Sequence, residues 1–472
     1  MKAKFFLPGL VLAFGIALTG CGGNNDAPAQ TVETPTVTET PTQTPAETPA
    51  AEEDTPSRDL GGVELIIANW WGSYDTDTFV PDTAEQEAVL EARIAAEQRY
   101  NFRMREVNVG GWDDFQELVA LSILADDPVG HIIMLEPQWF AALRPQGLFA
   151  PLNNHVNFND RSAISWHGPS IELATSGGNQ YGFAIGYIIG GGIYFNQRLF
   201  EEAGLDPELP FDLQLSGEWT WDRFLEIAHQ LTRDTDNTGV ADTWALASFS
   251  NDILTRAVAS NNAAFVSLDA QGNFVNTTNT LEFLEALTFV NALEDEGVMM
   301  PQPEGSEWNW FNEAFWNANV AMRTGGHYMA GSHINENLND PWGFVSFPMG
   351  PNASNYVFMG NQNITVVPSS FSTQEVDDIM FAYQLWMTTP EDFRDPDAWM
   401  FANFPNHPNP RSVEESMALF MRNPDLGVPL LHGLVPGLQI GDISWEMWHG
   451  NDPAAIVEAV QQSWNETIGQ MN

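Results

Sequence analysis

The chain has 472 residues, a length that predicts two domains rather than one hydrophobic core. It carries 63 acidic and 17 basic residues, a formal net charge of −46, which excludes nucleic acid as a partner because phosphate binding needs a basic surface. Lys2 and Lys4 are the only lysines, so every later basic residue is an arginine, a composition that reflects either an alkaline or saline exterior or genomic drift.

The first 21 residues predict an export signal. Lys2 and Lys4 form a positive start, residues 5–18 are apolar but too few to span a bilayer, and Leu18-Thr19-Gly20-Cys21 ends the stretch with small residues. This ending resembles the lipobox of bacterial lipoproteins. The resemblance implies a signal peptide of residues 1–20 and fatty acylation of Cys21, with palmitate as a typical acyl chain. The alternative is a plain secretory signal with an incidental thiol.

Residues 21–60 predict an extended tether behind that anchor. Residues 22–57 contain repeats of Glu, Thr and Pro and no aromatic residue, Leu, Ile or Met, so they cannot bury enough apolar surface to fold. In a polyproline II geometry such a segment reaches on the order of 100 Å. The protein is therefore expected to be anchored at the outer face of a bacterial cytoplasmic membrane.

From residue 61 onward, short apolar strands alternate with amphipathic helices, which predicts right-handed crossovers and a mostly parallel α/β sheet. Helix starts are indicated at Thr83, Thr220, Ser372 and Asp452 by capping residues. The expected strands are 63–68, 102–107, 131–135, 192–195 and 364–367, and the first three helices are 83–100, 113–125 and 138–146.

Six segments in this part share short motifs with one known family. They are 147–152 (GLFAPL), 181–184 (YGFA), 193–205 (IYFNQRLFEEAGL), 219–224 (WTWDRF), 320–328 (VAMRTGGHY) and 342–350 (WGFVSFPMG). Their order and spacing resemble the extracellular solute-binding proteins of bacterial ABC importers, in the sugar-binding branch. Gln197 replaces a family lysine, as the lysine-free composition leads one to expect.

The resemblance implies a two-lobed, periplasmic-binding-protein-like α/β fold of type II with the ligand cleft between discontinuous lobes. Residues 61–186 and 341–410 would form lobe 1, and residues 187–340 and 411–472 lobe 2. The run Gly190-Gly191-Gly192 either gives backbone freedom near the first crossing or makes a tight turn before a strand. The implied function is a monomeric, non-enzymatic carrier that delivers a carbohydrate, an oligosaccharide, to ABC permease subunits.

Candidate ligand-binding residues follow from two arguments. Ligands of open α/β sheets lie beyond the carboxyl ends of strands, and sugar rings stack on aromatic faces while carboxylates and amides bond their hydroxyl groups. Most of the 17 tryptophans are expected to pack in the core. The leading candidates are Trp71, Glu136, Tyr328 and Trp445, followed by Asn69, Trp70, Asp113, Gln138, Trp139, Gln362 and Trp448.

The segment 234–242 resembles the start of a calcium-binding EF-hand loop. Asp234, Asp236 and Asp242 would supply oxygen ligands, whereas Thr238 and Ala245 replace expected acidic ligands. A structural calcium site and a metal-free acidic turn are both open, and no other cofactor is expected. The sequence has no nucleophile-elbow, zinc-protease or P-loop motif. The alternatives to a carrier are a secreted glycoside hydrolase or lyase and a surface lectin, each with an aromatic-lined cleft.

Overall fold

The computed structural model describes residues 58–186, 189–270, 273–359, 362–395, 397–423 and 426–471. The expected signal peptide, Cys21 and the tether up to residue 57 lie outside these residues. Within them, no helix has both the length and the apolar character needed to cross a membrane.

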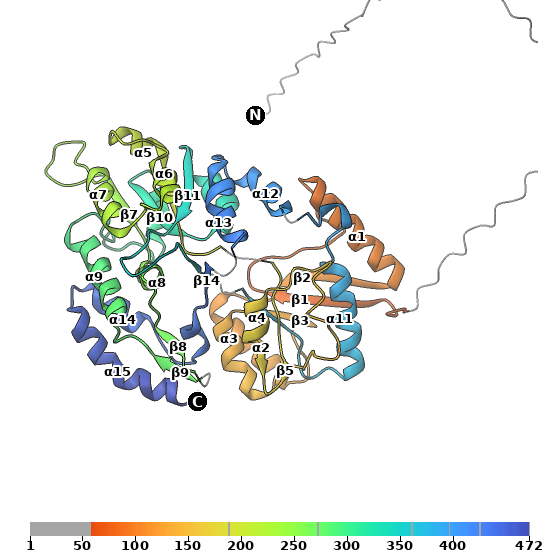
Figure 1. Ribbon diagram of the computed structural model, residues 1–472. Coiled ribbons are helices and arrows are strands. Elements are labelled where there is room, and N and C mark those ends of the chain that lie inside the picture. The colour runs from red at the N-terminus through yellow and green to blue at the C-terminus, as the bar shows by residue number, and fades with distance from the viewer. Residues whose placement is uncertain are drawn as a thin grey trace, which may run out of the picture. The chain divides into compact units, whose positions relative to one another are not determined.

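The first lobe is built on a four-stranded sheet in the order β13-β3-β1-β2. β1 pairs in parallel with β2 and β3, and β13 is antiparallel to β3. Leu65 and Ile67 pack on the face covered by α11, and Ala68 packs on the face covered by α2 and α3 (Figure 1). The elements are β1 Val63–Asn69, α1 Ala84–Tyr100, β2 Phe102–Asn108, α2 Trp112–Leu124, β3 Ile132–Leu135, α3 Pro137–Leu143, η1 Arg144–Gln146, α4 Gly168–Leu173, β4 Thr175–Ser176, β5 Asn179–Gln180, β13 Ile364–Val366, α11 Thr373–Met387 and η4 Glu391–Phe393.

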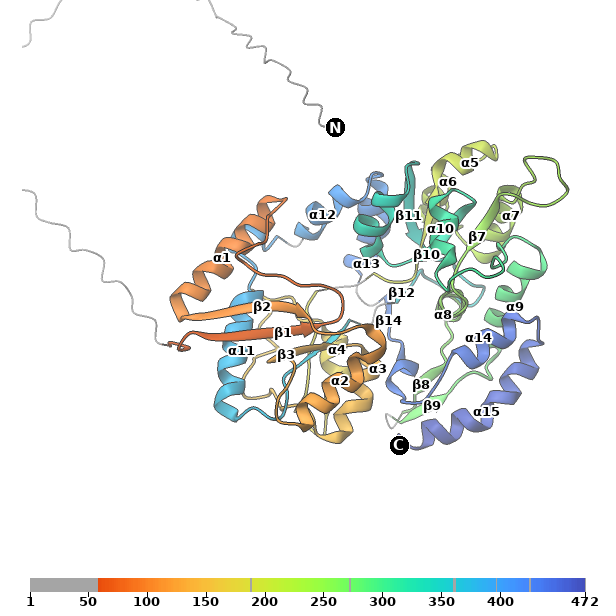
Figure 2. The same cartoon turned by 180° about the vertical axis from the view of Figure 1, so that it is seen from behind.

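The second lobe has a four-stranded sheet in the order β11-β6-β10-β7. Figure 2 shows this lobe from behind. Its central strand β6 is antiparallel to β10 and β11, so the expectation of a mostly parallel sheet is wrong here. The strands are β6 Gly192–Asn196, β7 Trp244–Ala247, β8 Val266–Leu268, β9 Phe274–Asn276, β10 Val320–Gly325, β11 Trp342–Ser346, β12 Phe358–Met359 and β14 Gly427–Val428. The helices are α5 Gln197–Glu202, α6 Leu209–Ser216, α7 Trp221–Leu231, α8 Ser250–Ser260, α9 Leu281–Asp295, α10 Trp310–Trp316, η2 His327–Met329, η3 Ala330–Asn335, α12 Ala398–Asn403, η5 Phe404–Asn406, η6 Ser412–Met417, α13 Ala418–Met421, η8 Leu431–Leu434, α14 Gly441–Trp448 and α15 Pro453–Gly469.

The assignment of residues 341–410 to the first lobe needs correction. β11 pairs along its whole length with β6, and Trp342 and Phe344 are buried in the second core. Trp399 of α12 also packs against that core. Among the described residues of this range, β13, α11 and the segment between them join the first sheet and its core. The proline at 341 does not mark a crossing, because its carbonyl accepts a bond from Gln197 N (2.9 Å) at the start of α5.

The glycine run lies where two crossing segments meet. Gly190 pairs with Met359, and a Cβ on Gly190 would lie 2.3 Å from the Met359 carbonyl oxygen. Gly191 has a φ of 85°, a conformation that residues with a Cβ rarely adopt. Both positions therefore need glycine, one for close backbone approach and the other for its dihedral angle.

Candidate ligand-binding site

Four tryptophans gather beyond the carboxyl ends of β1, β2 and β3. The Trp70 ring lies 4.7 Å from Trp71, 5.6 Å from Trp112 and 4.8 Å from Trp139, each in an edge-to-face arrangement. Trp139 is buried, whereas Trp71 is 49% exposed and Trp112 is 47% exposed. We call these four residues the first-lobe platform. It presents two open aromatic faces fixed to the core of the lobe.

Asn69 orients the platform from beneath. Its side chain is fully buried, and its Oδ1 accepts bonds from the backbone N–H groups of Trp71 (3.0 Å) and Gly72 (3.1 Å). These bonds turn the chain sharply after β1. Asn69 thus orients Trp71, while its Nδ2 is buried without a hydrogen-bond partner among the described residues, so its contact with ligand stays a prediction.

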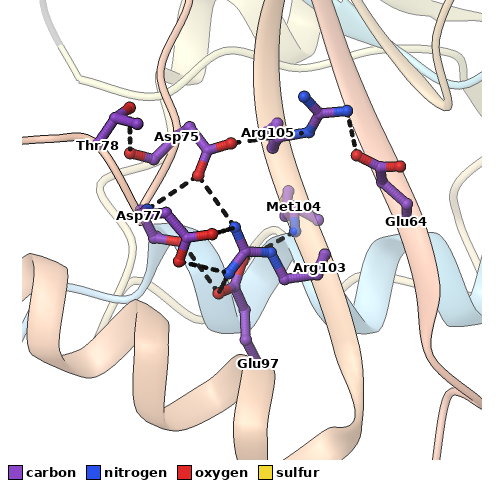
Figure 3. Close-up of polar contacts among 9 residues, drawn as sticks. Glu64, Asp75, Asp77, Thr78, Glu97, Arg103, Met104 and Arg105 are labelled. Atoms are coloured by element: carbon purple, nitrogen blue, oxygen red, sulfur yellow. Dashed lines mark hydrogen bonds and ion pairs between the residues drawn. The ribbon is translucent and has the colours of Figure 1, made fainter.

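An acidic network holds the loop that follows Trp71. The Arg103 guanidinium on β2 bonds Asp75 (3.0 Å) and Asp77 (2.8 Å), as Figure 3 shows. Glu97 of α1 is buried and accepts bonds from Met104 N (2.9 Å) and Thr76 Oγ1 (3.1 Å). The loop between the platform and α1 is thus tied to both β2 and α1.

Glu136 follows β3 and begins α3. Its side chain is partly buried, and burial raises the pKa of its carboxyl group to about 7. No bond or ion pair joins this carboxyl group to another residue in the part of the chain that the structure describes. Gln138 is exposed in the first turn of α3, and Asp113 is exposed in the first turn of α2.

The second lobe carries its own aromatic cavity, with a volume of about 350 Å³. We call it the second-lobe aromatic pocket. Trp445 and Trp308 are 63% and 68% exposed. Its walls come from Phe249, Trp308, Trp310, Trp445 and Trp448, with polar groups from Ser248, Asn251 and Gln302. The sequence predicts Trp445 and Trp448 as candidates, which lie within α14, but not Phe249, Trp308 or Trp310. Phe249 follows β7, a strand of only four residues that the sequence pattern did not reveal.

Tyr328 belongs to η2, which follows β10, and is 61% exposed. Burial of its hydroxyl group, then Asp252 and, more weakly, Glu136 of the first lobe raise the pKa of Tyr328. The electrostatic influence of Glu136 on Tyr328 links a candidate residue of the first lobe with one of the second lobe.

Two guanidinium groups act electrostatically on Tyr328. Arg323 is only 2% exposed, bonds Asn312 Oδ1 (2.5 Å), and burial lowers its pKa to about 10. Arg256 pairs with the Asp252 carboxylate at 3.0 Å.

Gln362 belongs neither to the first-lobe platform nor to the second-lobe aromatic pocket. It is buried and lines a different cavity of about 340 Å³ with Pro137, Arg161 and His167. Its contribution to a common site stays a prediction.

The acidic loop brings its three carboxylates together. Oxygens of Asp234, Asp236 and Asp242 lie within 4.8 Å of one another. The oxygens of Asp234 already accept bonds from Thr238 N (3.0 Å) and Gly239 N (2.7 Å) of the same loop. The residue types suit calcium, while these internal bonds also suit a metal-free turn, so both interpretations stand.

The fold has many relatives among solved structures. The ABC substrate-binding protein from Listeria monocytogenes, in complex with cycloalternan, is 15% identical with a TM-score of 0.59, over 86% of this chain and 99% of that chain. The cyclic α-maltosyl-1,6-maltose binding protein from Arthrobacter globiformis is 17% identical with a TM-score of 0.60, over 86% and 99%. UgpB from Mycobacterium tuberculosis, in complex with glycerophosphocholine, is 13% identical with a TM-score of 0.61, over 86% and 98%.

At these identities the likeness shows the fold, which is the expected two-lobed, periplasmic-binding-protein-like architecture. No curated protein matches the sequence. Residues 82–375, more than half of the chain, match the family described as bacterial extracellular solute-binding protein. The chain therefore belongs to the family of bacterial extracellular solute-binding proteins, which bind their solutes without chemical conversion.

Proposed function

We propose that the protein captures a carbohydrate, an oligosaccharide, and delivers it to the permease subunits of an ABC importer. The observation that carries this proposal is the pair of exposed aromatic surfaces, the first-lobe platform and the second-lobe aromatic pocket. Sugar rings present C–H faces that stack on indole and phenol rings. The descriptions of two of the solved relatives name a saccharide, cycloalternan in one and cyclic α-maltosyl-1,6-maltose in the other.

Recognition would proceed by closure of the two lobes on the sugar, with no bond made or broken. Trp71 would stack on one side, Tyr328 on the other, and Glu136 would bond sugar hydroxyl groups. The crossing segments at Gly190 and Met359 are joined by backbone bonds (Gly190 N to Met359 O, 2.6 Å) and would move together in such a closure.

Attachment to the membrane belongs to the same proposal. Cys21 would carry the lipid, and residues 22–57 would give the binding lobes reach from the outer face of the cytoplasmic membrane. The protein would act as a monomer and meet its permease there. A secreted form with an incidental thiol is the alternative.

The test is a ligand screen followed by calorimetry. A ligand at a hundredfold excess over its dissociation constant stabilises a protein by about 2.7 kcal/mol, enough to raise the melting temperature measurably. Oligosaccharides of several linkages should produce such a rise and a stoichiometric binding curve, and the sugar should be recovered unchanged. Because one structural relative holds glycerophosphocholine, this diester belongs in the screen. A rise with the diester alone would contradict carbohydrate capture. If the protein binds a sugar but a reconstituted permease has no effect on the complex, the surface-lectin alternative is favoured.

A further inference from the structure

We propose that Glu136 makes the site select saccharides by charge: an amino-substituted saccharide binds more tightly than its neutral parent, and a carboxylated one binds more weakly. The proposal rests on the carbohydrate-binding function proposed above. It identifies the class of substrate by its charge, which residues on both lobes would select.

The first step is the isolation of the Glu136 carboxyl group. It begins α3, beside the platform residue Trp139, yet makes no capping bond to that helix. Within the described residues it has no ion pair and no hydrogen-bonded side chain. A partly buried carboxylate without a cation is poorly stabilised, as the pKa of about 7 reflects. A cationic group of a bound ligand would therefore be a favourable partner for it.

The second step is that the basic groups near Tyr328 and α3 are already engaged or neutral. Arg256 Nη1 lies 3.0 Å from the Asp252 carboxylate and donates to the Asp252 carbonyl oxygen at 2.9 Å. Arg323 is buried under the strand end, and its Nε donates to the Thr324 carbonyl oxygen at 3.1 Å. His432 in η8, which packs on α3, has a pKa lowered by burial to about 4, so it is neutral at physiological pH. None of these three groups offers a free positive charge to an anionic sugar.

The third step is the sign of the surrounding charge. Asp113 in the first turn of α2, Asp442 in the first turn of α14 and Glu446 are exposed carboxylates beside the two aromatic surfaces. The whole chain adds a formal charge of −46. A site of this sign attracts cations and repels anions. One cation argues in the opposite direction, since Arg161 lines the neighbouring cavity together with Pro137 of α3. Arg161 is thus the rival determinant, and its substitution belongs in the test.

The chemical consequence is a rank order. An ammonium group facing Glu136 forms a charge-assisted hydrogen bond, about twice as strong as a neutral one, which corresponds to an affinity gain on the order of tenfold. A carboxylate at the same place brings a like charge into a partly desolvated region and loses affinity by a similar factor.

The experiment uses maltotetraose and cellotetraose, each in three forms that differ only at C6: hydroxymethyl, aminomethyl and carboxyl. Calorimetric dissociation constants are measured near pH 7.5 for the wild type, Glu136→Gln, the surface control Asp114→Asn and Arg161→Gln. The wild type and Asp114→Asn should show the order amino, neutral, carboxyl on whichever backbone binds. Glu136→Gln should bring the dissociation constants of the three forms within about twofold of each other, while its melting temperature is no lower than that of the wild type.

The other outcomes distinguish the charge-selection proposal from the carbohydrate-binding proposal. If the neutral sugar binds but the amino form binds no better, or if Glu136→Gln keeps the full order, the charge selection is wrong and carbohydrate binding stands. If the carboxyl form binds best and Arg161→Gln abolishes that preference, Arg161 determines specificity instead. If no form of either tetrasaccharide binds, and the wider screen also fails, carbohydrate binding itself is overturned. The wild-type rank order is informative even if Glu136→Gln does not fold.

Discussion

Glu136 of the first lobe and Tyr328 of the second lobe are electrostatic neighbours. The pKa of Tyr328 is raised by burial of its hydroxyl group and by Asp252, and the carboxyl group of Glu136 adds to this effect. This electrostatic interaction connects two candidate residues that are far apart in the sequence and belong to different lobes. It leads to the first prediction.

Replacing Tyr328 by alanine should weaken saccharide binding by about 1–3 kcal/mol, the range for a large apolar side chain that loses its burial. Because the side chain is 61% exposed without ligand, the melting temperature of the free protein should hardly change. Tyr328→Phe keeps the ring and should retain most of the affinity if stacking dominates. A Tyr328→Ala protein that melts normally and binds as tightly as the wild type would remove Tyr328 from the site.

The second prediction concerns pH. The pKa of Glu136 is about 7 in the folded protein, above its ordinary value, so the folded state binds more protons than the unfolded state. Its contribution to stability is full below the ordinary pKa and is lost as the pH rises through 7. Tyr328 in η2, which interacts electrostatically with Glu136, and His432 in η8, which packs on α3, stay neutral between pH 5 and 8 because the pKa of Tyr328 is raised and that of His432 is about 4.

Glu136→Gln should therefore gain stability relative to the wild type as the pH rises from 5 to 8, by at most about 3 kcal/mol. Denaturant unfolding at each pH measures the difference. Taking the difference between variant and wild type cancels Glu294, whose pKa is also raised to about 7 and which titrates in both proteins. A difference that is constant with pH would show that the Glu136 carboxyl group is not desolvated.

The third prediction concerns the buried end of the network in Figure 3. Glu97→Ala should destabilise the protein by about 3 kcal/mol, because it leaves Met104 N and Thr76 Oγ1 without their acceptor. Asp77→Ala, at the exposed end of the same network, should cost less than about 1 kcal/mol. Chemical denaturation of the two variants makes the comparison. Equal losses would contradict the view that burial, rather than charge, decides the importance of these groups.

The fourth prediction concerns the acidic loop. If Asp234, Asp236 and Asp242 hold calcium, a chelator should lower the melting temperature of the wild type. Asp236→Ala should then melt at the lower temperature with or without chelator. An unchanged wild-type melt, with no metal found by elemental analysis, would identify the loop as a self-bonded turn.

The fifth prediction concerns the anchor. Cys21→Ser should move the protein from the membrane fraction to the medium, because Cys21 is the only cysteine in the chain. Immunoblots of the two fractions measure this change. A variant that stays with the membrane would exclude the lipoprotein interpretation.

Local structure was well predicted from the sequence. Thr83, Thr220 and Asp452 cap their helices through the side chain, and Ser372 forms the full reciprocal capping box with Glu375. Such caps depend on neighbours within four residues, which the sequence displays directly. Lobe membership was predicted less well, because the pairing of β11 with β6 joins residues about 150 positions apart and no local pattern encodes that choice.

Part of the candidate site could be predicted from the sequence. Trp70, Trp71 and Trp139 follow strands that are predicted from runs of apolar residues. Because ligands lie beyond strand ends, this position makes the three tryptophans candidates. Trp308 and Trp310 belong to no strand end, and only the fold places them with Trp445 around one cavity. Conversely, Asn69 satisfies the same rule but is fully buried, because its side chain is needed to bond the turn.

The central claim is that a saccharide lies between the lobes and contacts both. Hydroxyl-radical footprinting read by mass spectrometry tests it most directly, with the best ligand of the screen present or absent. Both Trp71 and Tyr328 should become protected by the saccharide, while Phe401, which is 70% exposed on α12, should be oxidised equally in both samples. Protection of residues on one lobe alone, or of neither ring under saturating ligand, would contradict the claim.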